Sequence, residues 1–178
     1  MRRLIYLTPL AVLILLTIHF LIGLDRNPQT LPSAVINTQI EEFELAAIEG
    51  KTKGFSSSDL RGQVALVNIF GSWCIACREE HPFLMELAIN NVIPIFGINW
   101  REANRQDGPT WLKRFGNPYV LVGDDPRSRG AIAFGVTGAP ETFIIDKKGV
   151  IRFRYTGPLS EKVWLKELLP IIKELRKQ

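Results

Sequence analysis

Two cysteines lie between a short apolar run and a segment of helical periodicity, and this arrangement constrains the fold most strongly. Residues 64–70, VALVNIF, form a nearly continuous apolar run of strand length, the pattern of a strand buried on both faces. From residue 74 to residue 90, apolar side chains recur at helical spacing, at Phe83, Leu84, Leu87 and Ala88. We therefore expect Cys74 at the start of a helix and Cys77 one turn further on, directly after a buried strand.

Helical and strand patterns alternate along the rest of the chain. Strands are expected at 40–45, 92–99 and 119–123, helices at 107–115 and 127–134, a hairpin around the turn at 147–149, and a last helix from Ser160. Ser58 or Asp59 is the expected cap of a helical turn, and Pro82 and Pro170 are expected to disturb their helices. This order predicts a three-layer α/β sandwich with a central mixed β-sheet.

The N-terminal segment 4–24 predicts a transmembrane helix. It runs for 21 residues without Asp, Glu, Lys or Arg. A helix of that length reaches about 30 Å, the thickness of the bilayer hydrocarbon. A cleaved signal peptide and a buried core helix are the alternatives, but the run exceeds the roughly 7–15 apolar residues of a signal peptide and no clear cleavage site follows. We expect an uncleaved anchor.

Charge and composition give the expected domain organisation. Arg2 and Arg3 precede the apolar run and favour a cytoplasmic N-terminus of residues 1–3, so the rest of the chain is expected across the membrane. Residues 25–38 are rich in turn formers and predict a linker, which leaves 39–178 as one globular domain. Basic residues are scattered and the net charge is only +4, so no nucleic-acid partner is expected.

The cysteine pair has four candidate roles. Zinc needs about four ligands, and beyond the two cysteines the domain offers one histidine, His81, so no metal is expected. Covalent haem attachment needs histidine directly after the second cysteine, where this chain has Arg78. A structural disulfide closing so short a loop stabilises the fold by only roughly 2 kcal/mol. A redox-active disulfide remains, with no other cofactor.

The redox interpretation assigns a different task to each cysteine. At a helix N-terminus, free N–H groups and the helix dipole stabilise a thiolate on Cys74, the cysteine expected to be exposed and to attack. Cys77, on the same helix face, can then attack the mixed disulfide and release the partner. Trp73 is expected to shield the pair and to offer an apolar platform to a partner chain.

The chain resembles the membrane-anchored thiol:disulfide interchange proteins of cytochrome c maturation, the CcmG/DsbE family. Four stretches between residues 64 and 164 carry the resemblance: VNIFGSWCIACREEHP, WLKRFGNPY, GVTGAPETFIID and GVIRFRYTGPLS. The resemblance implies a thioredoxin-like fold in which Pro140 is cis and faces the disulfide. It also implies that the backbone of Ala139 pairs with an extended substrate.

Two departures from ordinary thioredoxin concern residues near the pair. Asn68 stands where thioredoxin has a buried aspartate, so Cys77 needs another base. The resemblance points to Glu141, and our hypothesis is that its carboxylate raises the cysteine pKa values or accepts the Cys77 proton. The segment after residue 98 matches a family insertion, in which four residues are candidates for a recognition rim or simply a loop: Asn99, Trp100, Arg101 and Glu102.

The resemblance also implies a direction of electron flow and a set of partners. Ile75 and Ala76 supply no cation between the cysteines. Negative charge nearby, on Glu79, Glu80 and Glu141, opposes a strongly lowered cysteine pKa, and both features favour a reductant over an oxidant. The expected function is reduction of the C-x-x-C-H disulfides of apocytochrome c, directly or through a maturation factor, on the periplasmic side of the inner membrane. Electrons are expected from a thiol carrier of the DsbD/CcdA type. A broader anchored reductase of the ResA/TlpA type, a thiol peroxidase and a non-catalytic tether are the alternatives.

Overall fold

The structure, a computed structural model, describes residues 8–24, 35–48 and 53–178. The chain divides into a unit ending at residue 30 and a unit of residues 31–178. The first contains helix α2, Thr8–Leu24, of 17 residues. Within the described ranges no helix has both the length and the apolar character required to cross a membrane. The expected anchor is therefore not supported, although residues 4–7 of that segment and most of the expected linker lie outside the description.

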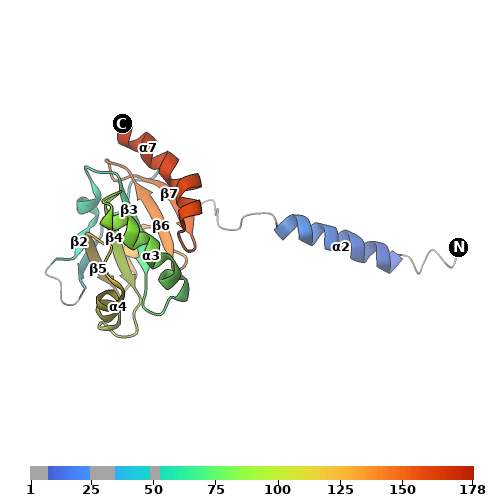
Figure 1. The fold of residues 1–178 in the computed structure, drawn as a ribbon, viewed down its shortest axis with the longest axis horizontal. Helices are drawn as coiled ribbons and strands as arrows, with labels where there is room; N and C mark the ends of the chain where they lie inside the picture. The colour runs from blue at the N-terminus through green and yellow to red at the C-terminus, as the bar shows by residue number, and fades with distance from the viewer. Residues whose placement is uncertain (1–7, 25–34, 49–52) are drawn as a thin grey trace. The chain divides into compact units, whose positions relative to one another are not determined.

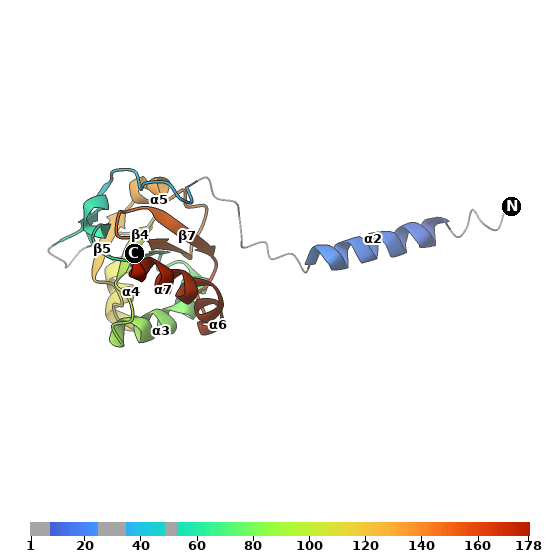
Figure 2. The ribbon, with the colours of Figure 1, turned by 90° about the horizontal axis from the view of Figure 1, so that it is seen from above.

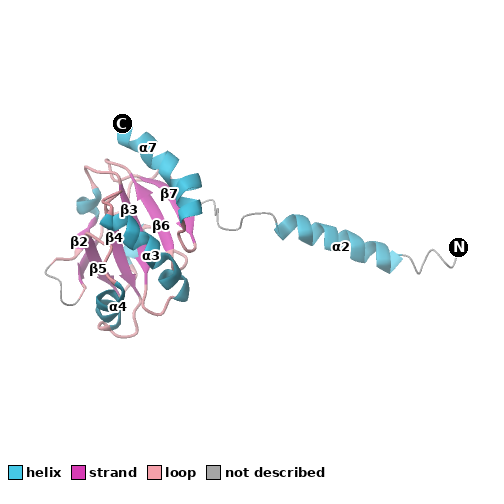
Figure 3. Cartoon of the chain, in the orientation of Figure 1, coloured by secondary structure: helices cyan, strands magenta, loops and turns pink. Residues whose placement is uncertain are grey.

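The second unit is built on one mixed seven-stranded sheet (Figures 1 and 3). Its strands are β1 (Glu44–Ala47), β2 (Phe55–Ser56), β3 (Ala65–Phe70), β4 (Ile95–Trp100), β5 (Leu121–Asp125), β6 (Glu141–Ile145) and β7 (Ile151–Thr156). Their order across the sheet is β2-β1-β5-β4-β3-β6-β7. The central strands β3, β4 and β5 are parallel, whereas β6, β7, β1 and β2 join by antiparallel pairing.

Helices and loops cover both faces of this sheet. The helices are η1 (Ser57–Leu60), α3 (Ile75–Ile89), α4 (Asp107–Phe115), α5 (Arg129–Ala133), α6 (Glu161–Val163), η2 (Trp164–Leu168) and α7 (Leu169–Lys177). One core cluster joins α3, α4 and the C-terminal helices to the sheet, and a second lies under α5 and the segment before β1. In Figure 2, α5 lies on the side of the sheet opposite α3 and α7. The expected α/β sandwich is confirmed.

Differences from the predicted elements have local causes. The first strand is Glu44–Ala47, not 40–45, because Ile40 and Phe43 leave the sheet and pack in the second core cluster. Strand β2 was not expected, since two residues are too short for a periodic pattern. The cap of η1 is Ser56 rather than Ser58 or Asp59, and the Asp59 carboxylate accepts the Ser56 backbone N–H in return.

The C-terminal helical segment continues through Pro170. Glu161–Val163 is α-helical, Trp164–Leu168 forms a π-helical turn, and Leu169–Lys177 is α-helical again. Pro170 falls in the first turn of α7, where a missing N–H is tolerated. Buried Trp164 and Leu168 therefore stay on the sheet side without a break in the chain direction.

Candidate active site

The cysteine pair sits at the N-terminus of α3. Cys74 is the N-cap residue and its Sγ accepts a hydrogen bond from the Cys77 backbone N–H at 3.1 Å. The two sulfurs form a disulfide with an S–S distance of 2.00 Å. Cys74 is 5% exposed and Cys77 1%, so the first cysteine is the more accessible but is less open than expected. The helix terminus and this N–H would stabilise a thiolate on Cys74.

A buried carboxylate lies one helical turn beyond Cys77. Glu80 is only 1% exposed. Its Oε1 accepts from Asn68 Nδ2 at 2.8 Å, and its Oε2 accepts from the Leu159 backbone N–H at 2.7 Å. Because residues three apart share a helix face, the Glu80 carboxylate and the Cys77 thiol belong to the same buried face of α3.

Burial gives Glu80 the protonation behaviour of a general acid or base. Desolvation raises its pKa from 4.5 to about 7, while the hydrogen bonds from Leu159 and Asn68 oppose the rise. A carboxyl group with a pKa near neutrality can both take and return a proton. The hypothesis from sequence placed the base at Glu141 and counted Glu80 only as a negative charge near the cysteine pair. The available signal was its position on the apolar stripe of the helix, three residues after Cys77.

Asn68 links Glu80 to the neighbouring strands. Its Nδ2 also lies 3.1 Å from Thr142 Oγ1, and its Oδ1 accepts from the Tyr119 hydroxyl at 2.8 Å. Burial raises the pKa of Tyr119 well above its ordinary value, so this hydroxyl keeps its proton. The asparagine is thus the centre of a buried polar network spanning β3, α3 and β6.

The predicted substrate-pairing loop lies beside the cysteine loop. The Ala139–Pro140 peptide bond is cis. Strand β6 begins at Glu141, which pairs with Ile69 near the end of β3, and β3 leads directly into the cysteine loop. The sheet register therefore brings Ala139 and Pro140 next to the segment that carries Cys74.

Glu141 is buried in that loop and is engaged by its neighbours. Its side chain is 0% exposed, and its Oε1 lies 2.9 Å from an Arg154 guanidinium nitrogen. The same oxygen accepts from the backbone N–H groups of Thr137 and Gly138, both at 2.9 Å. These contacts fix the backbone just before the cis proline, whereas the proton-accepting role proposed from sequence stays a prediction.

A hollow of about 390 Å³ adjoins Trp73, the residue directly before Cys74. It is lined by Trp73, Trp100, Arg101 and Ala103. Trp73 is half exposed, as a platform residue should be, and its indole Nε1 donates to the Trp100 carbonyl at 3.1 Å. The structure thus brings the residues after β4 against the loop before Cys74, where a partner chain would approach.

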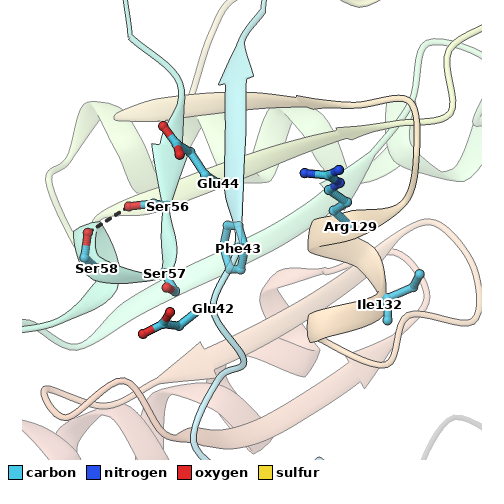
Figure 4. Close-up of a pocket in the computed structure, with 8 residues that line it drawn as sticks. All are labelled: Glu42, Phe43, Glu44, Ser56, Ser57, Ser58, Arg129 and Ile132. Carbon is cyan, nitrogen blue, oxygen red and sulfur yellow. Dashed lines mark hydrogen bonds between the residues drawn. The ribbon is translucent and has the colours of Figure 1, made fainter.

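Another depression, of about 810 Å³, lies on the β1–β2 side of the sheet (Figure 4). Arg129 and Ile132 of α5 line one side and Ser56 to Ser58 the other. Its lining includes neither cysteine, so it is not the redox site. Among the residues that the structure describes, no group of three or more His, Cys, Asp or Glu side chains is placed to hold a metal ion.

Comparison with known proteins agrees with this geometry. A model of the Redoxin family matches residues 35–168. The thiol:disulfide interchange protein DsbE of Pseudomonas aeruginosa is 38% identical over 175 residues, which cover 98% of this chain and 96% of that protein. DsbE of Escherichia coli K12 is 34% identical over 184 residues, covering 100% and 98%. The chain belongs to the DsbE family of thiol:disulfide interchange proteins.

Solved structures support the fold of this DsbE-family chain. A thioredoxin-family thiol:disulfide interchange protein from Chlorobium tepidum has a TM-score of 0.63 and 26% identity, covering 80% of this chain and 99% of that one. A DsbF homologue from Corynebacterium diphtheriae has a TM-score of 0.67 and 20% identity, covering 85% and 95%. The thioredoxin-like fold with a mixed central sheet is confirmed. With its C-x-x-C disulfide, the protein is a thiol:disulfide oxidoreductase.

Proposed function

We propose that this oxidoreductase works as a reductant, with Cys74 as nucleophile, Cys77 as resolving thiol and Glu80 as the base for Cys77. The observation that carries the proposal is the buried Glu80 carboxylate, whose pKa lies near 7, one turn from Cys77. A strong oxidant needs a stabilised thiolate and hence a stable reduced form. When Glu80 is ionised, its negative charge disfavours a thiolate on the nearby cysteine pair. The reduced form is therefore less stable, and the disulfide form is favoured.

The reaction transfers two electrons and two protons. The Cys74 thiolate attacks one sulfur of the partner disulfide, and a mixed disulfide forms while the other partner sulfur leaves as a thiolate and is protonated. Glu80 then takes the Cys77 proton, and the Cys77 thiolate attacks Cys74 Sγ. The bond to the partner breaks, its second sulfur leaves as a thiolate that takes the proton held by Glu80, and the Cys74–Cys77 disulfide forms. The first partner thiolate takes its proton from solvent, which balances the proton that Cys74 lost when it ionised.

The family resemblance supports the proposed substrate class. We assign the C-x-x-C-H disulfide of apocytochrome c, reduced directly or through a maturation factor. Electrons would return from a membrane thiol carrier of the DsbD/CcdA type. The loop of Ala139 and Pro140 would pair with the extended substrate, with Trp73 as its apolar platform.

For location, we propose a single-pass anchor in the inner membrane with the catalytic domain in the periplasm. The uncharged 21-residue run at 4–24 and the preceding Arg2 and Arg3 support the anchor and its orientation. Extraction of cell membranes with alkaline carbonate tests the anchor, and protease accessibility in spheroplasts tests the orientation. Release by carbonate, or protection of the domain in spheroplasts, would contradict it.

The function is tested with the reduced full-length protein and a peptide containing an oxidised C-x-x-C-H segment. We expect stoichiometric reduction of the peptide, loss of the reaction in Cys74→Ser, and an accumulated mixed disulfide in Cys77→Ser. Glu80→Gln should slow resolution of the mixed disulfide by about 100-fold, the usual contribution of one positioned base. Alkylation trapping in intact cells should find reduced thiols. Mainly oxidised cysteines, or equal activity on unrelated disulfides, would favour another direction or a broader reductase.

A further inference from the structure

The loop before Cys74 is tied to the segment after β4 by a carboxylate. Glu102 Oε1 accepts the Ser72 backbone N–H at 2.6 Å, and Glu102 Oε2 lies 2.6 Å from Ser72 Oγ. Glu102 Oε1 also accepts from Asn99 Nδ2 at 2.7 Å. Three charge-assisted hydrogen bonds thus converge on one side chain, two of them from a residue only two positions before the attacking cysteine.

A sharp backbone turn after β4 orients the Glu102 carboxylate. Arg101, between the end of β4 and Glu102, has φ of 52°, a left-handed conformation that is uncommon for arginine. The turn points Glu102 back at Ser72 and leaves Arg101 over the Trp100 ring at 5.6 Å. The indole of Trp73 donates to the Trp100 carbonyl, so the two loops are joined at Ser72 and again at Trp73.

We propose that Glu102 is a positioning residue that fixes the Ser72–Trp73 segment, and with it the wall of the hollow on which a partner polypeptide docks beside Cys74. It acts through Ser72, because its oxygens bind Ser72 and Asn99 and not the sulfurs. The inference deepens the proposed function and rests on it in one respect, the identity of the docked chain. The rate of reduction of a small disulfide, which does not dock in the hollow, should not depend on Glu102.

Two substitutions of Glu102 distinguish the effect of its hydrogen bonds from the effect of its negative charge. Glu102→Ala removes all three bonds. Glu102→Gln keeps the geometry, since its carbonyl can accept from Ser72 N–H and Asn99 while its amide donates to the Ser72 hydroxyl. Glu86→Ala, at an exposed position of α3, is the control for removal of one negative charge.

The full-length variants are compared by steady-state reduction of the C-x-x-C-H peptide and of hydroxyethyl disulfide. Glu102→Ala should raise the KM for the peptide about tenfold, the loss expected from one to two net charged hydrogen bonds, with kcat little changed. The rate with hydroxyethyl disulfide should stay within about twofold. Glu102→Gln and Glu86→Ala should match the wild type in both assays.

Two further readouts do not depend on the peptide being the true substrate. Amide hydrogen exchange at Ser72 and Trp73 should accelerate at least about tenfold in Glu102→Ala and stay slow in Glu102→Gln. The pH profile of Cys74 alkylation should be the same in all variants. Unchanged exchange, an unchanged peptide KM, or an equal shift of the alkylation profile in Glu102→Ala and Glu102→Gln would overturn the positioning role. A wild type that reduces no peptide overturns the proposed substrate, while amide exchange still decides the role of Glu102.

Discussion

At the scale of single residues, Glu80 makes the stability of the domain depend on pH. The pKa of this carboxyl is about 7 in the folded protein against an ordinary value of 4.5. A raised folded pKa means that the folded state holds the proton more tightly than the unfolded state. The stabilising contribution is therefore complete below pH 4.5 and is lost as the pH rises through 7.

The first prediction concerns Glu80→Gln. Between pH 5 and pH 8 the free energy of unfolding of the oxidised wild type should fall by up to about 3 kcal/mol because of this group, and the variant should lose that slope. Urea unfolding at four pH values measures it. Glu79→Gln, at an exposed position of the same helix, is the control and should keep the wild-type slope. Parallel slopes for Glu80→Gln and the wild type would contradict the assignment.

The second prediction concerns the ion pair below the cis-proline loop. Arg154 and Glu141 have side chains that are 6% and 0% exposed, so neither charge is solvated when its partner is removed. Arg154→Met should lower the free energy of unfolding by about 3 kcal/mol, the usual effect of stranding a buried charge. Adding Glu141→Gln should recover part of the loss. Urea unfolding of both variants is the measurement, and a double variant less stable than Arg154→Met would speak against the pair.

Prediction from sequence succeeded for residues whose role can be inferred from the spacing of nearby residues. Cys74 and Cys77 were found from the strand and helix around them. Glu80 was within reach of the same periodicity, but its burial depends on Asn68 and Leu159, which lie 12 and 79 residues away in sequence. Glu102 was a candidate for a recognition rim, but its contact with Ser72 could not be predicted, because that contact depends on the turn at Arg101.

At the scale of elements, Gly97 of β4 lies against the ring of Tyr119, just before β5, with no room for an added methyl group. A Cβ on Gly97 of β4 would lie 2.8 Å from the ring of Tyr119, which holds Asn68. We predict that Gly97→Ala lowers the free energy of unfolding by about 1–3 kcal/mol through overpacking. Gly138→Ala, where a Cβ meets nothing within 4 Å, is the control. Thermal unfolding of both variants checks this, and equal melting temperatures would refute the close packing.

Elements with strong periodicity were predicted well. The helix Asp107–Phe115 has the expected bounds, and the nearly continuous apolar run before the cysteines contains β3. Strand β5 extends past its expected end to Asp125, because that carboxylate is buried and accepts the backbone N–H groups of Arg129 and Ala131 at the start of α5. Asp125, two residues beyond the expected strand end, is therefore a strand residue whose side chain caps the next helix.

At the scale of the whole molecule, the globular unit should fold without the N-terminal unit. Deleting residues 1–30 should leave the melting temperature and the rate with hydroxyethyl disulfide unchanged, and should abolish the membrane association that we propose. Differential scanning calorimetry and sedimentation of lysed cells provide the measurements. A truncated chain that melts at a lower temperature would show that the N-terminal unit contributes to the core.

The order of strands was beyond prediction from periodicity alone. Alternating helices and strands gave the mixed sheet, but the pairing of β1 with β5, and of β6 with β3, joins segments far apart in sequence. The family resemblance supplied the thioredoxin-like arrangement instead. The proposed anchor at 4–24 rests on composition, and residues 4–7 of it lie outside the described residues.

The asparagine at position 68 has a consequence for how the proton moves. Ionised Glu80 faces two donors, the Asn68 amide and the Leu159 N–H. Once protonated, one of its oxygens becomes a donor and would meet another donor. An amide can resolve this by turning end for end, and the hydroxyls of Tyr119 and Thr142 on its other sides can each give or receive a hydrogen bond. An ionised aspartate could offer only acceptors at this position, whereas an asparagine can present a donor to ionised Glu80 and an acceptor to protonated Glu80.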